Sequence, residues 1–129
     1  MTRRNSRQAV LHLRKLKREL GTNPPSLGRV KLTQLIEEAV LDAYTEEEQA
    51  AGFFTMIEEH LALPFPVKIL GIDADVENVD MTLEGQIVAI CHRGKTRQKI
   101  AILDLPLPTP TPAGAEWIAA YRHWCRGDW

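Results

Sequence analysis

Residues 42–65 read DAYTEEEQAAGFFTMIEEHLALPF, a stretch that joins a run of acidic residues to a strongly apolar helical pattern. Its apolar residues recur at spacings of three and four, which predicts a helix with one buried face. These residues are Ala50, Phe53, Phe54, Ile57 and Leu61. Thr45 followed by Glu48 three positions later fits a capping box, so we expect the helix to begin at Glu46 and to end before Pro64. The acidic run therefore occupies the first turn of this helix.

A second apolar stripe precedes the acidic run and predicts a helix that packs against the first. Its members are Leu32, Leu35, Ile36, Ala39, Val40 and Ala43. The pattern breaks near Tyr44. Glu38 and Asp42 are four positions apart, so we expect a helix of this length to carry both carboxylates on one face. The two helices would then meet at an acidic bend.

Beyond Pro64 the sequence changes to short runs rich in β-branched residues and divided by turn residues. The runs cover residues 67–72, 76–81, 86–92 and 97–103, with turns expected at Asp73, at Gly85 and over residues 93–95. Such a series of strands favours a small antiparallel barrel. Prolines at 106, 108, 110 and 112 then predict an extended segment. A final helix follows, with Trp117, Tyr121 and Trp124 on one face. We therefore expect an α+β fold, with a helical pair packed on a small antiparallel β-barrel and a C-terminal helix.

The 129 residues suit one domain, and their net charge of −1 hides a division. Residues 1–31 carry nine of the 16 Lys and Arg but one of the 17 Asp and Glu, so their net charge is +8. Residues 32–129 carry the remainder and have a net charge of −9. Leucines at helical spacing followed by Gly and Pro predict that residues 1–31 form a basic amphipathic helical arm and a linker. This arm is suited to nucleic-acid phosphates, to an acidic protein or to the chain's own acidic face.

Composition also limits the class of function. Cys91 and Cys125 lack the paired spacing of a zinc ribbon and no secretory signal is evident, so we expect free thiols in a reducing cytoplasm. No apolar run approaches the roughly 20 residues that span a bilayer. The sequence contains no nucleophile elbow, phosphate-binding glycine loop or HExxH motif, and we predict that the protein is not an enzyme.

The acidic bend has the chemistry of a calcium site, because Ca²⁺ takes roughly six to eight hard oxygen ligands. The candidate ligands are Asp42, Glu47 and Glu48, with Glu38 as a helper. Capping and the helix dipole explain acids at positions 46–48 without any ion, but they do not explain Asp42 or Glu38. From the residues alone, a metal site and a solvated helix end both remain open.

A family resemblance enters at these residues. The segments Asp42-Ala43-Tyr44, Glu47-Glu48-Gln49-Ala50, Gly52 and Leu63-Pro64-Phe65-Pro66 resemble the signature of the small bacterial calcium-binding proteins of the CcbP type. The resemblance implies a helical lid on an SH3-like β-barrel and a protein that binds Ca²⁺ through surface carboxylates. Asp42, Glu47 and Glu48 match residue by residue, so the resemblance assigns them to the metal. It implies a protein that buffers or senses calcium without catalysis.

Three other patterns compete with this hypothesis. Asp73, Asp75, Glu77 and Glu84 have the spacing of EF-hand ligands, but Asn78 stands where that loop needs Gly. A basic run over residues 92–99 could act with the arm on phosphates, which gives the alternative of a small-barrel nucleic-acid-binding protein or protein adaptor. Cys91-His92 and His123 with Cys125 could form a zinc site, although neither pair has a familiar spacing.

Overall fold

The computed structural model describes residues 28–127, so the predicted arm lies outside the described residues except where its last positions enter the first described helix. The helical elements are α2 (Arg29–Ala39), α3 (Glu46–His60), the short 3-10 helix η1 (Ile102–Asp104) and α4 (Ala115–Arg126). The strands are β1 (Phe65–Ile69), β2 (Ile72–Met81), β3 (Ile87–Arg93) and β4 (Thr96–Ala101). The predicted α+β class and C-terminal helix are confirmed.

The four strands form an antiparallel meander in the order β1-β2-β3-β4. Predicted closure into an SH3-like barrel is not confirmed, because β1 and β4 remain the two edges of an open sheet. The chain after β4 enters η1 and then a segment with proline at every second position from 106 to 112. Proline has no backbone N–H, so this segment cannot extend the sheet as a regular fifth strand.

The first hairpin turns earlier than the sequence indicated. The prediction placed the turn at Asp73, whereas Ile69 pairs with Ile72 and the two residues between them form the turn. Leu70 has a φ of 51° and Gly71 a φ of 79°. A two-residue turn with two successive positive φ angles normally has Asn, Asp or Gly at its first position and Gly at its second. Leucine at the first position does not give that signal. As a result β2 begins at Ile72 and contains Asp73.

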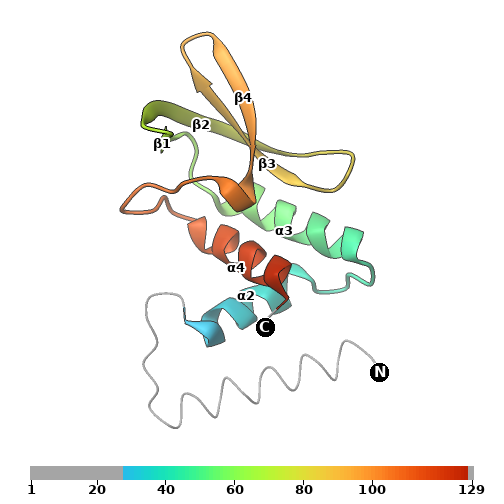
Figure 1. The fold of residues 1–129 in the computed structure, drawn as a ribbon. Coiled ribbons are helices and arrows are strands. Elements are labelled where there is room, and N and C mark those ends of the chain that lie inside the picture. Colours follow the sequence, from blue (N-terminus) through green and yellow to red (C-terminus); the bar gives the residue numbers. More distant parts are fainter. Residues whose placement is uncertain (1–27, 128–129) are drawn as a thin grey trace.

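The core lies between one face of the sheet and the helices. Figure 1 shows the sheet over α3, with α4 beneath α3 and α2 on the far side of α4 from the sheet. The largest fully buried side chains come from every layer and comprise Ile36, Phe53, Ile57, Val76, Ile87, Ile102, Leu105 and Ile118. Full burial of each such side chain contributes about 1.5–3 kcal/mol. Phe53 also contacts the rings of Tyr121 and Trp124, with centroids 5.6 and 5.2 Å away.

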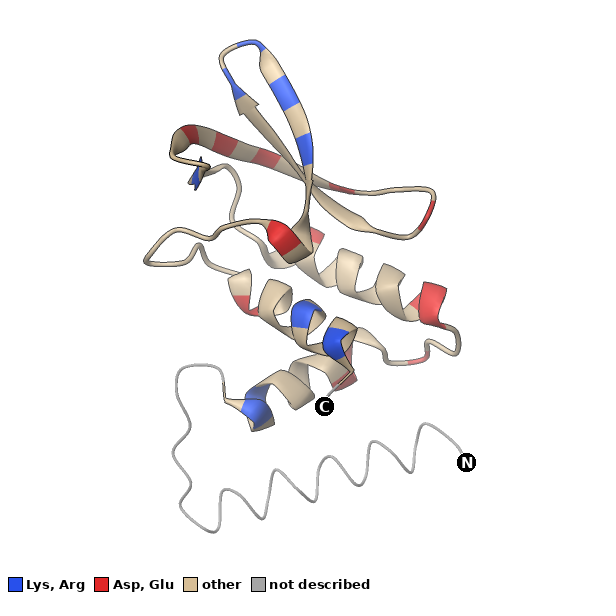
Figure 2. Ribbon diagram, in the orientation of Figure 1, with Lys and Arg blue, Asp and Glu red and all other residues tan. Residues whose placement is uncertain are grey.

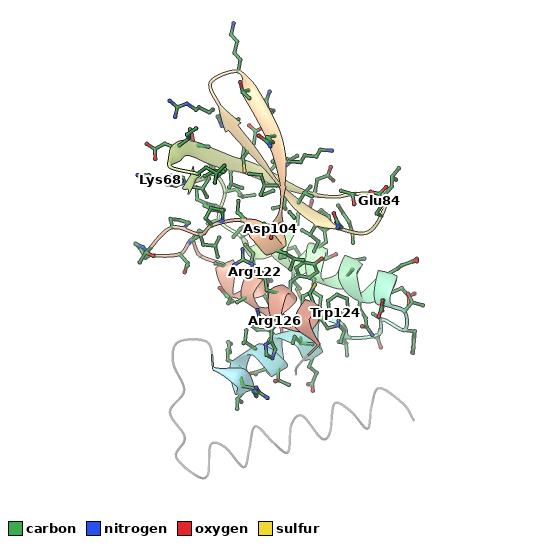
Figure 3. The ribbon with its side chains drawn as sticks, viewed as in Figure 1. Lys68, Glu84, Asp104, Arg122, Trp124 and Arg126 are labelled. Carbon is green, nitrogen blue, oxygen red and sulfur yellow. The ribbon has the colours of Figure 1, made fainter. Side chains whose placement is uncertain are left out.

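Arg122 ties the start of the proline segment to α4. Its guanidinium donates hydrogen bonds to the carbonyl oxygen of Ile102 at 2.7 and 3.1 Å and to that of Leu105 at 2.6 Å. Figure 3 shows Arg122 beneath η1, where Asp104 lies. Burial lowers the pKa of Arg122, while the charge of Asp104 opposes this shift. Because the guanidinium stays charged, its hydrogen bonds to these carbonyls are charge-assisted.

Within residues 28–127, no helix is both long enough and apolar enough to cross a membrane.

Candidate calcium site

The apolar stripe runs to Ala43, but α2 ends at Ala39. The bend between α2 and α3 therefore begins at Val40. The Val40 N–H still donates to the Ile36 carbonyl at 3.0 Å. The Ala43 N–H then donates to the Val40 carbonyl at 3.0 Å, which closes a tight turn. Asp42, in this turn, has a φ of 63°. Aspartate enters this left-handed region more readily than most residues because its short polar side chain can bond locally.

This geometry corrects the predicted relation between Glu38 and Asp42. Glu38 lies in the last turn of α2 and is exposed, whereas Asp42 lies beyond the helix end in the left-handed turn. The four-residue helical spacing therefore does not place their carboxylates on one helix face. The apolar stripe continued to Ala43 because Ala43 is buried, at 7% exposed, by the turn and not by a longer helix.

Glu48 closes the other side of the bend. Its Oε1 accepts hydrogen bonds from the backbone N–H groups of Tyr44 at 2.8 Å and Thr45 at 3.1 Å. In return the Glu48 N–H donates to Thr45 Oγ1 at 3.0 Å, so the predicted capping box and the helix start at Glu46 are both confirmed. This arrangement holds one carboxylate oxygen of Glu48, Oε1, in the cap.

Gly52 sets how closely the two helices approach at the bend. A Cβ atom at this position would lie 2.1 Å from the carbonyl oxygen of Ala39, the last residue of α2. Only glycine permits this approach of α3 to the end of α2. The sequence carried a signal of this contact, because glycine is otherwise unfavourable within a helix by about 1 kcal/mol.

Two electrostatic effects act on a cation at the bend, the dipole of α3 and the charge of the acidic side chains. The N-terminus of α3 carries the positive end of a helix dipole, equivalent to roughly half a charge, and therefore repels a cation. Glu46, Glu47 and Glu48 lie in this first turn, and Asp42 lies in the turn before it. All four side chains are exposed. Carboxylates in the first turn of a helix offset the positive end of its dipole, which reduces this repulsion.

The donors at the bend suit calcium in kind, since they are carboxylates with hard oxygen atoms. In the described part of the chain, however, no three His, Cys, Asp or Glu side chains already form a group that could hold a metal ion. The carboxylates of Asp42 and Glu47 would have to converge with Oε2 of Glu48 when an ion arrives. Calcium tolerates such a site because water and backbone carbonyls can complete its coordination.

The EF-hand-like spacing does not produce an EF-hand loop. Asp73, Asp75 and Glu77 all lie within the extended strand β2, which cannot curl around an ion as that loop does. Glu77 is also engaged by Arg97, whose Nε donates to Oε1 at 2.5 Å, and this hydrogen bond lowers the pKa of Glu77. Figure 2 shows acidic residues along β2 and basic residues along β4 and the β3–β4 turn.

The cysteine and histidine pairs give no zinc site among residues 28–127. Cys91 is buried in β3, at 3% exposed, and burial raises the pKa of its thiol. Cys125 lies on α4, and burial also raises the pKa of that thiol. Zinc binds thiolates, so both shifts oppose zinc binding.

The fold and the bend define a small α+β protein with exposed acidic residues between its first two described helices. The sequence model of the CcbP family, described as calcium binding, matches residues 33–125. This match covers most of the chain and includes the whole bend, so the chain belongs to the CcbP-type calcium-binding family, and Ca²⁺ is the ligand that this family implies. Comparisons with curated proteins and with solved structures give no match.

Proposed function

We propose that this protein binds calcium at the bend between α2 and α3 without catalysing a reaction. Asp42, Glu47 and Glu48 supply carboxylate oxygens, and Glu38 assists from the end of α2. The observation that carries the proposal is that the calcium-binding family match spans a bend whose backbone is already ordered by the Glu48 cap. An ordered bend lowers the entropy that must be lost when the ligands converge.

The proposed division of roles follows from the hydrogen bonds at the bend. Glu48 would keep Oε1 in the cap and offer Oε2 to the ion, so the fold of the bend need not change on binding. Asp42, in its left-handed turn, would approach from the α2 side, and Glu47 from the first turn of α3. Calcium affinity increases with the number of carboxylates and with the rigidity of the site.

This site favours a role in buffering over one in high-affinity sensing. Its carboxylates are exposed and are not assembled into a ligand group beforehand, so side chains must lose freedom when the ion binds. We therefore expect a dissociation constant of roughly 10⁻⁵–10⁻³ M, in the weaker part of the range for protein calcium sites. Mg²⁺ should bind more weakly still, because it demands near-octahedral geometry and gives up its water reluctantly.

Calorimetric titration of the full chain with calcium chloride, with magnesium chloride as the comparison ion, tests the proposal. The double variant Asp42→Asn with Glu47→Gln should weaken calcium binding by at least tenfold. The matched control is Glu58→Gln with Glu59→Gln, which removes the same charge from exposed positions near the other end of α3. An absence of binding at millimolar calcium would refute the function. Equal effects of the two double variants would refute the site.

The alternative of a nucleic-acid-binding protein or adaptor has less support from the described residues. Within the basic hairpin, Arg97 is paired with Glu77, and Arg93 donates to the backbone oxygen of Asp73 at 2.9 Å. The Arg97–Glu77 ion pair neutralises part of the charge that would attract phosphates. A salt-sensitive mobility shift with DNA or RNA would favour the alternative, because such binding releases counterions.

A further inference from the structure

The sheet carries an apolar groove at the end where its two outer hairpins turn. The groove has a volume of about 720 Å³ and lies between the β1–β2 hairpin and the β3–β4 hairpin. Its apolar lining residues include Ile69, Leu70, Ile72, Ala74 and Ile100. Three of these side chains, Ile69, Ala74 and Ile100, are partly buried and pack against the core. The groove is therefore an extension of the core face of the sheet into solvent.

Leu70 is the most unusual residue of the groove. Its side chain is 97% exposed, and its φ of 51° lies in a region that leucine rarely adopts. Asparagine or glycine would satisfy this turn better on both counts, since each tolerates a positive φ and exposes less apolar surface. The adjacent Ile72 is 54% exposed. Burial therefore does not explain why leucine occupies the hairpin tip at position 70.

Arg93 is the permanently charged side chain of the described groove lining, and the lining residue His92 lies 3.8 Å from the carboxylate of Glu77. The polar lining of the groove consists of His92, Arg93, Thr96 and Gln98, and no Asp or Glu is among the described lining residues. The Arg93 guanidinium donates to a backbone carbonyl, that of Asp73, so this contact does not neutralise its charge. Lys95 lies between two lining residues in the β3–β4 turn. An occupant of complementary character presents apolar side chains to the apolar lining and carboxylates to the rim.

We propose that this groove binds an extended, acidic amphipathic segment of a partner protein. Alternate side chains of an extended segment point to opposite sides, so one set would contact Ile72 and Ile100 while the other approaches Arg93 and Lys95. The chain's own arm is a poor occupant because residues 1–31 have a net charge of +8. Edge-to-edge pairing with a second copy is also disfavoured, since each sheet edge carries a lysine, Lys68 on β1 and Lys99 on β4.

Fluorescence anisotropy with the full chain tests the groove. The probe is a fluorescein-labelled peptide of ten residues in which leucine and glutamate alternate, and the comparison peptide alternates leucine and lysine. We expect the acidic peptide to bind and the basic peptide to bind at least tenfold more weakly. Lys95→Glu should weaken binding of the acidic peptide and reduce its dependence on salt.

A matched pair of leucine variants separates groove binding from general attraction to the basic arm. Leu70→Asn should weaken binding of the acidic peptide at least tenfold. It should not lower the melting temperature, because asparagine suits the positive φ at this position. The control is Leu83→Asn, since Leu83 is 104% exposed and lies in the β2–β3 turn. Figure 3 shows Glu84 of that turn at the opposite end of the sheet from Lys68 of β1. Leu83→Asn should bind the peptide as the wild type does.

Three results would overturn the proposal. Equal affinity of Leu70→Asn and Leu83→Asn for the acidic peptide would mean that the peptide binds elsewhere, for example on the basic arm. Equal affinity for the two peptides would show that charge complementarity plays no part. Binding to phosphatidylserine vesicles, with no binding of the acidic peptide, would identify the exposed hairpin as a lipid-binding element instead.

Discussion

Replacing Gly52 with alanine tests how the bend is built. Helix propensity alone predicts that Gly52→Ala stabilises the protein by about 1 kcal/mol, because alanine is the better helix former. The contact with α2 predicts the opposite, since the new Cβ would lie 2.1 Å from the Ala39 carbonyl oxygen and 3.2 Å from its carbon. The helix α3 would have to move away from the end of α2 by about 1.4 Å, because heavy atoms in contact normally lie about 3.5 Å apart.

The magnitude follows from the cost of overpacking. Inserting a methyl group into a well-packed contact costs typically 1–3 kcal/mol, and occasionally more. The close backbone contact favours the upper part of this range, so we expect a net loss of about 1–2 kcal/mol after the gain in helix propensity. For a domain of this size, each 1 kcal/mol lowers the melting temperature by about 4–8 °C. The movement should also weaken calcium binding, because it displaces the first turn of α3 from Asp42.

Urea denaturation of Gly52→Ala and wild type measures the change in unfolding free energy. The control is Ala51→Gly at the neighbouring exposed position, which should destabilise by about 0.5–1 kcal/mol through helix propensity alone. Both substitutions should therefore destabilise, although they change glycine and alanine in opposite directions. A Gly52→Ala variant that is more stable than wild type would refute the proposed role of the helix contact.

Three further predictions concern the cap, the proline segment and the sheet. Thr45→Ala should lower the unfolding free energy by about 0.5–2 kcal/mol in urea through loss of the cap, whereas an unchanged midpoint would contradict the capping role. Arg122→Ala should lower the unfolding free energy by about 1.5–3 kcal/mol because it removes charge-assisted hydrogen bonds to two carbonyls. Limited proteolysis should also cleave the proline segment faster in this variant. Equal cleavage of variant and wild type would argue against the tether. Glu77 has a folded-state pKa below its unfolded value, so its contribution to stability is present at neutral pH and declines as the pH falls through the lowered pKa. Melting temperatures measured from pH 7 to pH 3 should therefore fall further for wild type than for Glu77→Gln, and parallel curves would contradict the pairing with Arg97.

Local signals predicted the elements that depend on local contacts. The capping box of Thr45 and Glu48 lies within four residues, and it correctly gave the start of α3. The turn residues around Gly85 and Gly94 likewise marked the second and third hairpins of the sheet. Each of these features requires only the residue types present at the turn or helix end itself.

The missed features depend on tertiary contacts or on unusual residues. The apolar stripe through Ala43 reports burial, but burial can come from a turn as well as from a helix, so it overextended α2. Closure of the sheet depends on whether β1 meets β4, and no local pattern encodes that pairing. Leu70 hid the first turn because leucine is rare at a positive φ. Gly52 signalled a close approach, but only the packed helices show that its partner is Ala39.

The candidate site was predictable in composition more than in geometry. The sequence proposed Asp42, Glu47 and Glu48 as calcium ligands, and this assignment stays a prediction, whereas the family match supports calcium binding by the chain. It did not reveal that Oε1 of Glu48 holds the Tyr44 amide, because that hydrogen bond depends on how the chain enters the helix. It also placed Glu38 and Asp42 on one helix face, which the end of α2 at Ala39 rules out.

Backbone NMR during a calcium titration of the full chain tests the location of the site most directly. The amides of Tyr44 and Thr45 donate to Glu48, so a cation bound by that carboxylate should shift their resonances. We predict that the largest shifts fall on residues 42–48 and saturate together with the calorimetric binding curve. Largest shifts along β2, over residues 73–77, with unchanged Tyr44 and Thr45 amides, would contradict calcium binding at the bend.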